Sequence, residues 1–582
     1  MTDATVPAHG DARPVGRVLG TEDATPLSFW VAVTEGQYLQ LDDVVTTSRA
    51  IPGRDPVTVS GVVTAVRARH EGAQFDSDVF LISEGMLPAQ VQEAAEITVT
   101  RVEPEVFVPP RPGDAVFRAT GEARAAALYF DRMVRMVPLG RGRDGEPVYL
   151  NADFLDGSRG AHVSISGISG VATKTSFATW LLYSLLHSDA LGAEAVNTKV
   201  LIFNVKGEDL LLLDHPNKNL DDKLRAEYQR LGLTAGPFGS VTVFAPPREG
   251  DRNGTPDVAC RTTGVESFYW TVAEFCQQRL LPYVFADGDD ERQQYTMVVG
   301  QVAARLAREA EPKDDGAAVV DGQLLRSYGD LVDLLTERLG DEETRGQWAG
   351  TAIGMGTVNA FIRRMMSSKR DIGRLVRGDL PPRRKHGVST EDGSQVTIVD
   401  LHNLPDRAQR FVVGVVLRTE FERKEKAGSA RPLQFVVLDE LNKYAPREGT
   451  SPIKEILLDI AERGRSLGVI LVGAQQTASE VERRIAANSA IRVVGRLDPA
   501  EAGRPEYGFL PASQRQRVLM AKPGTMFVAQ PELPVPLVVE FPFPAWATRP
   551  QEAGDPPSST LRSATGTVDP FELADEDDDI PF

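Results

Sequence analysis

Seven almost uninterrupted apolar runs, separated by segments with helical spacing, most constrain how this 582-residue chain can fold. Strands that are apolar on both faces are typical of a parallel sheet covered by helices on both sides. Alternation of such strands with helices predicts an α/β fold from about residue 161 onward. In sequence order the runs are AHVSIS, KVLIFNV, SVTVFA, QVTIVDL, LQFVVLD, GVILVGA and AIRVVGRL.

The segment SPIKEILLDIAERGRSLG connects two of these runs, LQFVVLD and GVILVGA. It places Ile453, Leu457 and Ile460 at helical spacing, and Gly468 is the type of residue at which helices commonly end. We therefore expect a helix here that connects two parallel strands.

Shorter runs with strict alternation precede this part of the chain, between residues 26 and 125. FWVAVTEG, VTVSGVVTAVRAR, DVFLISEG, AEITVTRV and DAVFRAT alternate apolar and polar residues and are separated by turn residues. A period of two indicates antiparallel strands with one buried face. We expect a small β-barrel over 26–125, preceded by a disordered N-terminus over 1–25, which is polar and rich in Pro and Gly.

The chain is too long for a single core, so we expect several domains. We assign residues 126–545 to the α/β domain, which mostly helical sequence interrupts at about 250–390. From residue 546 to 582 the composition changes to Pro, Ser, Gly and acidic residues, which predicts a disordered acidic tail.

The formal net charge is −18, and residues 563–582 contain seven acids without a Lys or Arg. A basic footprint over the whole surface is therefore absent, and any contact with nucleic acid requires a local basic lining. The chain has no apolar run of 18 residues, its start MTDATVPAHGDARP lacks the features of a secretory signal, and Cys260 and Cys276 lack metal-ligand spacing. We expect a cytoplasmic protein with no membrane contact.

The segment HVSISGISGVATKTSFATWLL has the order of a phosphate-binding loop: a strand, a Gly-containing turn, a Lys-Thr pair and a helix. Gly167 and Gly170 would let backbone N–H groups approach phosphates, Lys174 would reach the β- and γ-phosphates of ATP, and Thr175 would bind Mg²⁺. The spacing departs from the usual motif, because Thr173 and not Gly precedes Lys174. An ordinary strand-to-helix turn is the alternative.

Two adjacent acids follow the buried strand in PLQFVVLDELNKYAP. At the carboxyl edge of a parallel sheet, Asp439 could hold Mg²⁺ and Glu440 could orient the attacking water. The alternative is a strand that simply ends in acids.

The next strand, GVILVGA, leads into Gln475 and Gln476 at the same predicted edge. A glutamine there could sense the γ-phosphate of the nucleotide, or it could belong to a polar loop. Arg463 and Arg465 precede this strand near the end of a helix, where cations also favour the helix dipole. Either arginine could instead act on the nucleotide of a neighbouring subunit.

The order of these motifs resembles the HerA/FtsK superfamily of ring-forming DNA-pumping ATPases, and HerA most of all. VVLDELNKYAP, ERGRSLGVILVGAQQTASEV and VTIVDLHNLPDRAQRFVVGVVLRTEFE are similar to that family, and the resemblance covers about 20–545. It implies a RecA-like P-loop ATPase core with a helical insertion, preceded by a HAS-barrel-like domain, and a hexamer using ATP and Mg²⁺. It further implies nucleotide contact by Lys174 and Thr175, metal binding by Asp439, catalysis by Glu440, sensing by Gln475, and action in trans by Arg463 or Arg465.

The resemblance implies an ATP-driven translocase or helicase on double-stranded DNA, acting in DNA end processing, repair or anti-phage defence beside a nuclease such as a NurA-like protein. The altered phosphate loop leaves an alternative open. The chain could be an oligomeric scaffold that binds ATP, hydrolyses it poorly, and recruits partners through its barrel and tail.

A basic segment, RRMMSSKRDIGRLVRGDLPPRRK, spans residues 363–385 and is a candidate DNA contact. It contains nine Lys or Arg against two Asp, and contacts that follow phosphates need no base readout. A solvated helical face explains the same pattern and is the simpler interpretation. The candidate residues are Arg363, Arg364, Lys369 and Arg370.

The chain ends in DEDDDIPF, an acidic run followed by two apolar residues and a proline. A solubilising tail has no need of the apolar tip, which resembles the C-terminal tip of bacterial single-stranded-DNA-binding proteins. That resemblance implies a docking peptide for proteins that recognise such tips, although a plain acidic tail or a segment that occupies the protein's own DNA channel remains an alternative. The docking residues would be Asp577, Asp578, Asp579, Ile580, Pro581 and Phe582.

Overall fold

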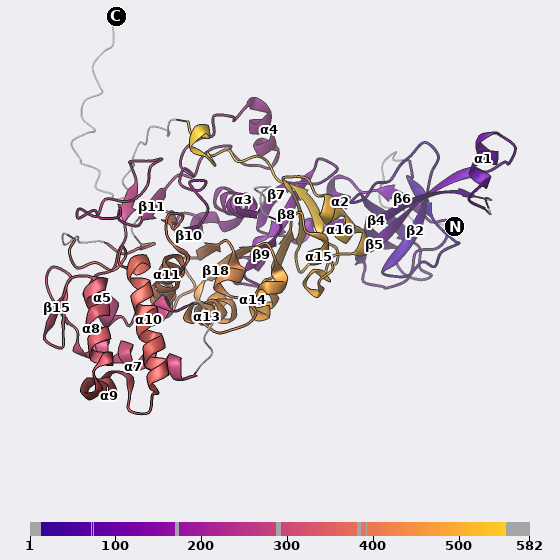
Figure 1. The fold of residues 1–582 in the computed structure, drawn as a ribbon. Coiled ribbons are helices and arrows are strands. Elements are labelled where there is room, and N and C mark those ends of the chain that lie inside the picture. Colours follow the sequence, from indigo (N-terminus) through magenta and orange to yellow (C-terminus); the bar gives the residue numbers. More distant parts are fainter. Residues whose placement is uncertain are drawn as a thin grey trace, which may run out of the picture.

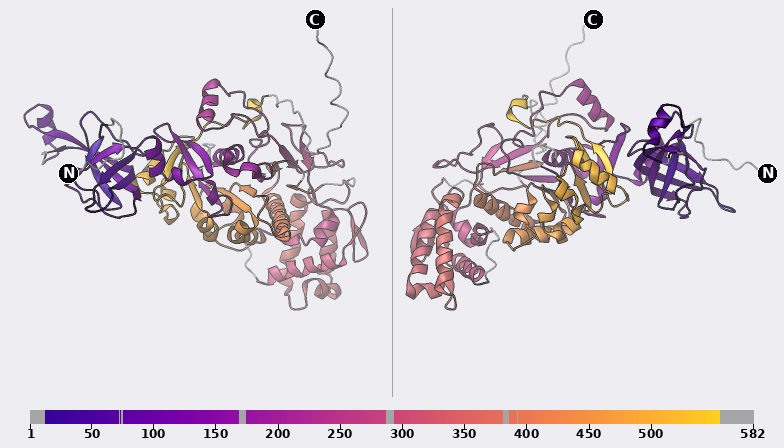
Figure 2. Two further views of the ribbon diagram at one scale, coloured as in Figure 1. Left: turned by 180° about the vertical axis from the view of Figure 1, so that it is seen from behind. Right: turned by 45° about the vertical axis from the view of Figure 1, so that its right-hand side comes forward.

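A closed barrel, a large central sheet and a group of helices follow one another along the molecule (Figure 1). The computed structural model describes residues 13–71, 73, 75–168, 174–286, 293–380, 386–391 and 393–554. Figure 2 shows that the barrel and the helical group lie at opposite ends of the central sheet.

Six strands close the N-terminal barrel in the order β1-β2-β5-β4-β3-β6, with β1 also pairing with β6. Alternate residues such as Phe29, Val31 and Ile97 are buried inside it, as the period-two pattern predicts. The strands are β1 (Gly16–Val18), β2 (Ser28–Val33), β3 (Val44–Arg49), β4 (Val57–Glu71), β5 (Gln90–Glu103) and β6 (Ala115–Arg118).

The barrel differs from the sequence prediction in two places. Its first strand, β1, lies inside the segment 1–25 that we assigned to a disordered N-terminus, because Gly16–Val18 pairs with both β2 and β6. The run DVFLISEG contains a short helix, α1 (Asp78–Ser83), and not a strand. Phe80 is 68% exposed there, so the apolar residues of this run do not face the barrel core.

All seven apolar runs predicted as buried strands form strands of the central sheet, which confirms the α/β fold. With β12 (Val265–Ser267) they are parallel in the order β12-β11-β16-β10-β17-β18-β9-β19. The seven are β9 (Val163–Ser166), β10 (Lys199–Asn204), β11 (Val241–Ala245), β16 (Val396–Asp400), β17 (Gln434–Leu438), β18 (Val469–Gln475) and β19 (Ile491–Val494).

Helices cover both faces of the parallel strands. On β17, Val436 and Leu438 pack into one apolar cluster, while Phe435 and Val437 pack into the other. The first cluster includes α11 (Asp406–Ala427) and α13 (Pro452–Leu467), and the second includes α3 (Lys174–His187). This double burial explains why the strands are apolar at almost every position.

Antiparallel strands extend the sheet beyond β19 to a total of twelve. These four strands are β20 (Thr525–Ala529), β21 (Leu537–Glu540), β7 (Met136–Arg141) and β8 (Pro147–Asn151). The segment between barrel and core thus contributes an edge of the sheet. Two short helices, α2 (Gly121–Ala127) and α16 (Ala512–Arg517), contact strands of the barrel. The other short helices of this part are α4 (Asp222–Arg230), α12 (Leu441–Tyr444), α14 (Arg483–Asn488) and α15 (Pro499–Ala502).

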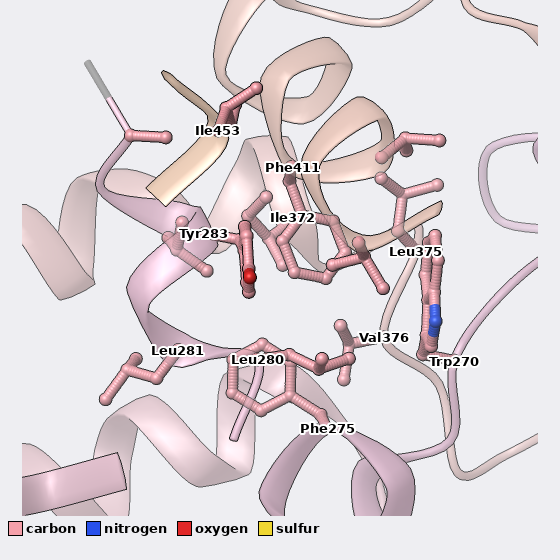
Figure 3. Close-up of a cluster of buried hydrophobic side chains, with 14 of the residues drawn as sticks. Trp270, Phe275, Leu280, Leu281, Tyr283, Ile372, Leu375, Val376, Phe411 and Ile453 are labelled. Atoms are coloured by element: carbon pink, nitrogen blue, oxygen red, sulfur yellow. The ribbon is translucent and has the colours of Figure 1, made fainter. Parts of the chain in front are cut away.

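The interruption predicted at about 250–390 is largely helical, but its first strand, β12, belongs to the central sheet. Figure 3 shows Phe275, Tyr283 and Ile372 of this insertion around Phe411 of α11. Three short strands form a separate sheet within it: β13 (Glu311–Pro312), β14 (Ala318–Val320) and β15 (Gln323–Leu325). Its helices are α5 (Val272–Gln277), α6 (Leu281–Val284), α7 (Gln293–Glu309), α8 (Tyr328–Gly340), α9 (Glu342–Ala349) and α10 (Met355–Ile372).

The folded part of the chain extends further than the sequence predicted at its C-terminal end. Residues 546–554 fall in the segment that we assigned to a disordered tail, yet Trp546 is fully buried. Among the described helices, none combines the length and the apolar composition that crossing a bilayer requires.

Gly468 ends α13 in a left-handed conformation, with φ of 68°. A Cβ at this position would lie 1.8 Å from the carbonyl oxygen of Ala430, so an alanine fits neither the backbone conformation nor the space. We expect Gly468→Ala to lower the free energy of unfolding by about 2–5 kcal/mol, measured by chemical denaturation.

Gly428 provides the matched control, because it ends α11 in the same conformation, with φ of 59°. A Cβ on Gly428 would meet no described atom within 4 Å. Gly428→Ala should therefore lower the free energy of unfolding only by the cost of the left-handed backbone, about 1–2 kcal/mol. Equal losses in the two variants would contradict the steric argument.

Candidate nucleotide-binding site

A cavity of about 320 Å³ lies at the carboxyl ends of β9, β10 and β17. Ligands of open α/β sheets bind at this edge. Lys174, Thr175 and Asp439, which the sequence singled out, all line it. The other lining residues are Ile168, Ser176, Thr179, Phe203, Asn204, Val205, Lys206, Asp209, Leu210, Trp546, Thr548 and Arg549.

Lys174 is the first residue of α3 and its side chain is buried. The Nζ atom donates a hydrogen bond of 2.6 Å to the carbonyl oxygen of Gly167, at the end of β9. Burial lowers the pKa of Lys174 to about 8, although Asp439 and Glu440 act against this shift. An anion in the cavity would stabilise the charged form. Gly170 and Thr173, also predicted to bind nucleotide, lie outside the described residues.

Thr175 and Asp439 meet although 264 positions separate them in the sequence. The Thr175 hydroxyl donates a hydrogen bond of 3.1 Å to Oδ2 of Asp439. A hydroxyl beside a carboxylate is an oxygen donor set that suits Mg²⁺, which retains several waters and needs few protein ligands. The described residues include no group of three or more His, Cys, Asp or Glu that could hold a metal ion, so a metal here would share its shell with nucleotide and water.

Lys206 also contacts Asp439, and the sequence analysis missed it. Its Nζ lies 2.6 Å from Oδ2 of Asp439. The ammonium group shows that this carboxylate accepts a cation in the cavity. Residue 206 follows the apolar run KVLIFNV, so the rule that places polar residues at strand ends would have found it.

Glu440 follows β17 in a left-handed conformation, with φ of 56° and ψ of 46°. Such a backbone is costly for a residue other than Gly and often marks a functional position. The backbone N–H of Glu440 donates to Oδ1 of Asp439 at 2.8 Å, which orients the metal-binding candidate. The Glu440 carboxylate has no ion pair among the described residues and interacts electrostatically with Lys174. It does not belong to the cavity lining, but it adjoins Asp439 at the rim.

Gln475 does not line the cavity that contains Lys174 and Asp439. Its Nε2 donates to the hydroxyls of Ser164 and Ser166 on β9, at 2.8 Å and 3.0 Å. Both serines line a different cavity, of about 350 Å³, together with Tyr507. Contact between Gln475 and nucleotide would require these bonds to break. The exposed neighbour Gln476 has no such constraint among the described contacts.

Arg463 and Arg465 both have partners within the chain. Arg463, which is about half exposed, pairs with Glu425 and lies 3.7 Å from Asp459. Arg465 donates two hydrogen bonds of 2.7 Å to the carbonyl oxygens of Gly157 and Ser158. Arg465 therefore joins the end of α13 to the loop before β9 through hydrogen bonds. The ion pairs of Arg463 are exposed and weaker.

The four candidate DNA contacts all belong to α10 but differ in their surroundings. Lys369 pairs with Asp333 at 2.5 Å, and Arg364 lies over the ring of Tyr295 at 4.8 Å. Arg363 and Arg370 are exposed and form no ion pair among the described residues. They are seven residues apart and thus share one face of the helix.

Three further polar groups in the cavity, at Asn204, Trp546 and Arg549, were not singled out by the sequence analysis. Asn204 and Trp546 are almost fully buried, and the Asn204 Oδ1 and Trp546 Nε1 atoms have no hydrogen-bond partner among the described residues. Arg549 lines the same cavity and is exposed. The candidate docking tip, residues 577–582, lies outside the described residues.

No protein-family model and no curated protein matches the sequence. Among solved structures, VirB4 of Thermoanaerobacter pseudethanolicus is similar, with 14% identity, a TM-score of 0.43, and coverage of 70% of this chain and 96% of that one. The bacterial conjugative coupling protein TrwBΔN70 with sulphate has 14% identity, a TM-score of 0.44, and coverage of 72% and 93%. The genome-packaging NTPase B204 of Sulfolobus turreted icosahedral virus 2, with AMPPCP, has 12% identity, a TM-score of 0.20, and coverage of 25% and 69%.

Proposed function

We propose that the chain is an ATP-driven motor that forms a ring and moves along double-stranded DNA. The observation that carries the ATPase assignment is the hydrogen bond between Thr175 and Asp439, which joins the phosphate-loop and acidic-strand motifs in one cavity. Lys174 would bind the phosphates, and Thr175 and Asp439 would hold Mg²⁺, which supplies charge neutralisation for phosphoryl transfer.

Glu440 is proposed to orient the attacking water. Its backbone N–H is bound to Asp439, and its carboxylate has no competing ion pair among the described residues. Catalysis of phosphoryl transfer depends mainly on positioning and electrostatics, for which a free carboxylate beside the metal ligand is suited. A phosphate-sensing role for Gln475 or Gln476 remains a hypothesis.

A hexamer is proposed as the working assembly, with Arg463 as the candidate for action on a neighbouring nucleotide. Arg463 is 52% exposed and has only exposed or partly exposed acidic partners, Glu425 and Asp459. Such pairs contribute little to stability and exchange readily. Arg465 is the weaker candidate, because two backbone carbonyls already hold it.

DNA contact is proposed for Arg363 and Arg370, the two exposed arginines on one face of α10. Phosphate contacts of this kind carry no sequence preference and depend on salt. Steady-state ATP hydrolysis with and without linear double-stranded DNA tests the motor assignment. We expect DNA to stimulate hydrolysis by the wild-type protein.

The double variant Arg363→Gln/Arg370→Gln should need more DNA for half-maximal stimulation. It should also lower the slope of log affinity against log salt by about 1.8, the amount expected for two phosphate contacts. Arg225→Gln, an exposed arginine on α4, is the control. Nucleotide binding without hydrolysis would instead favour the scaffold, an oligomer that uses ATP as a structural switch.

Partner recruitment is proposed for the tail and for the barrel. The tip DDDIPF would bind proteins that recognise single-stranded-DNA-binding-protein tails, through its terminal Phe and its acids. A nuclease partner is proposed for the β4–β5 hairpin, where Phe75, Phe80 and Met86 are 70%, 68% and 65% exposed. The physiological role would be DNA end processing, repair or defence against foreign DNA in the cytoplasm.

Deletion of residues 574–582 should abolish capture of tail-recognising proteins by the purified full chain. ATP hydrolysis should remain unchanged, because the deletion removes no residue proposed for nucleotide binding or catalysis. The measurement is a pull-down with purified partners at defined salt. Equal capture by the truncated protein would rule out the docking role of the tip.

A further inference from the structure

The C-terminal strap, residues 543–554, passes from the end of the sheet back over the start of the core and reaches the candidate nucleotide cavity. In Figure 1 its short helix η7 (Pro550–Glu552), drawn in yellow, lies beside α4. Both ends of the strap are held by the loop 215–218. The backbone bonds are Asn217 N to Ala545 O (2.9 Å), Ala547 N to His215 O (2.8 Å), Lys218 N to Glu552 O (2.8 Å) and Gly554 N to Pro216 O (2.8 Å).

Trp546 is fixed in place before any ligand binds. Its ring packs at 4.8 Å from Tyr183 and 5.0 Å from Phe238, between ring centroids, and it is fully buried. Tyr183 belongs to α3, the helix that begins with Lys174. The position of the indole is therefore coupled directly to the helix that carries the phosphate-binding candidates.

The Trp546 indole N–H is a buried donor that lines the cavity and has no acceptor among the described residues. Buried donors are almost always hydrogen-bonded, so an unpaired one facing a cavity indicates an acceptor that a ligand supplies.

Arg549 lies three residues further on, at the exposed rim of the same cavity. It has no ion pair among the described residues, although it interacts electrostatically with Asp209. Asp209 lines the same cavity, and burial raises its pKa although the nearby Arg549 acts to lower it. Arg549 is thus a cation that lines the cavity without an ion-paired acid among the described residues.

Three parts of the chain provide four donors that line the cavity: Lys174 of α3, Lys206 after β10, and Trp546 and Arg549 of the strap. Donors and cations converging on one cavity fit a polyanion with many acceptor oxygens. We propose that the strap completes the nucleotide site within the same subunit, and that Trp546 and Arg549 bind the phosphate chain of the nucleotide. This inference rests on the nucleotide site proposed above.

Equilibrium binding to the full-length protein, measured by calorimetry with ATP, ADP and inorganic triphosphate, tests the proposal. Arg549→Gln should weaken binding of ATP and of triphosphate equally, by about 10-fold to 100-fold, as for loss of a charge-assisted hydrogen bond. Trp546→Phe keeps the ring and loses the N–H, and should weaken both by roughly 3-fold to 10-fold. Arg230→Gln, an exposed residue of α4 outside the cavity, should bind like the wild type.

Hydrogen exchange on the wild type provides a readout that needs no variant. The backbone N–H of Ala547 should exchange more slowly when triphosphate is bound, because ligand contacts would hold the strap in place. Unchanged exchange, or unchanged triphosphate binding in both strap variants, would overturn the proposal. Weakened ATP binding with unchanged triphosphate binding would also overturn it, since the strap would then contact base or ribose. Failure of the wild type to bind any nucleotide would overturn the proposed function itself.

Discussion

Glu440→Gln is expected to slow ATP hydrolysis by about 10²-fold to 10⁴-fold, the usual contribution of a positioned acid or base. The substitution keeps the size of the side chain and the backbone N–H that binds Asp439 at 2.8 Å. Nucleotide affinity should therefore change by less than about threefold. Single-turnover hydrolysis together with equilibrium nucleotide binding separates the two effects.

Glu448→Gln is the control for the loss of one negative charge, since Glu448 is exposed and lies outside the cavity. A second variant, Glu440→Gly, relieves the left-handed backbone at φ of 56° while removing the carboxylate. It should be as inactive as Glu440→Gln but somewhat more resistant to denaturant. Hydrolysis at the wild-type rate in both Glu440 variants would assign the catalytic carboxylate to another residue.

Lys174→Ala is expected to weaken nucleotide binding by roughly 30-fold to several thousand-fold, equal to about 2–5 kcal/mol, because it leaves a buried phosphate without its cation. The thermal stability of the protein should change little. The buried ammonium is already disfavoured, as its pKa of about 8 indicates, and it donates only to the carbonyl oxygen of Gly167 among the described residues. Fluorescent-nucleotide titration and a thermal melt measure both quantities.

Lys223→Ala removes an exposed lysine of α4 and should leave affinity unchanged. If Lys174→Ala binds nucleotide like the wild type, the altered phosphate loop does not use this lysine. Nucleotide binding at Asp439 and Glu440 would then have to involve other residues than Lys174. The assignment of HVSISGISGVATKTSFATWLL as a phosphate-binding loop would be wrong.

The parallel core could be predicted because burial on both faces leaves a strong signal in each strand. Val436 and Val437 face opposite clusters, so the run LQFVVLD has no polar position between Gln434 and Asp439. The antiparallel edge gave no comparable signal. The strand β7 (Met136–Arg141) is mostly buried, but Pro138 and Gly140 interrupt its apolar residues and weaken the strand pattern.

The candidate site was predictable wherever a polar residue directly follows a buried strand, as Asp439 and Glu440 do. The direction in which such a side chain points could not be predicted. Gln475 is the last residue of β18, but the alternation of the strand turns its amide toward Ser164 and Ser166 of β9. A shift by one residue along a strand reverses the face, which the run of apolar residues cannot reveal.

Contacts between residues far apart in the sequence could not be predicted either. Trp546 lies where the composition turns toward proline and acids, and its partners Tyr183 and Phe238 are more than 300 positions away. Composition alone therefore placed a buried tryptophan in a disordered tail. The error at α1 had the opposite sense. The apolar residue Phe80 was predicted to be buried in a strand, but it is exposed.

The shared apolar core between the helical insertion and α11 has a consequence for engineering. Phe411 of α11 and Ile453 of α13 pack among side chains that the insertion supplies, so neither layer is complete without the other (Figure 3). Although the insertion occupies one continuous stretch of sequence, it is not a cassette that can be excised or exchanged alone. A chimera that replaced it would have to transplant the contacting faces of both helices, or leave an exposed apolar surface prone to aggregation.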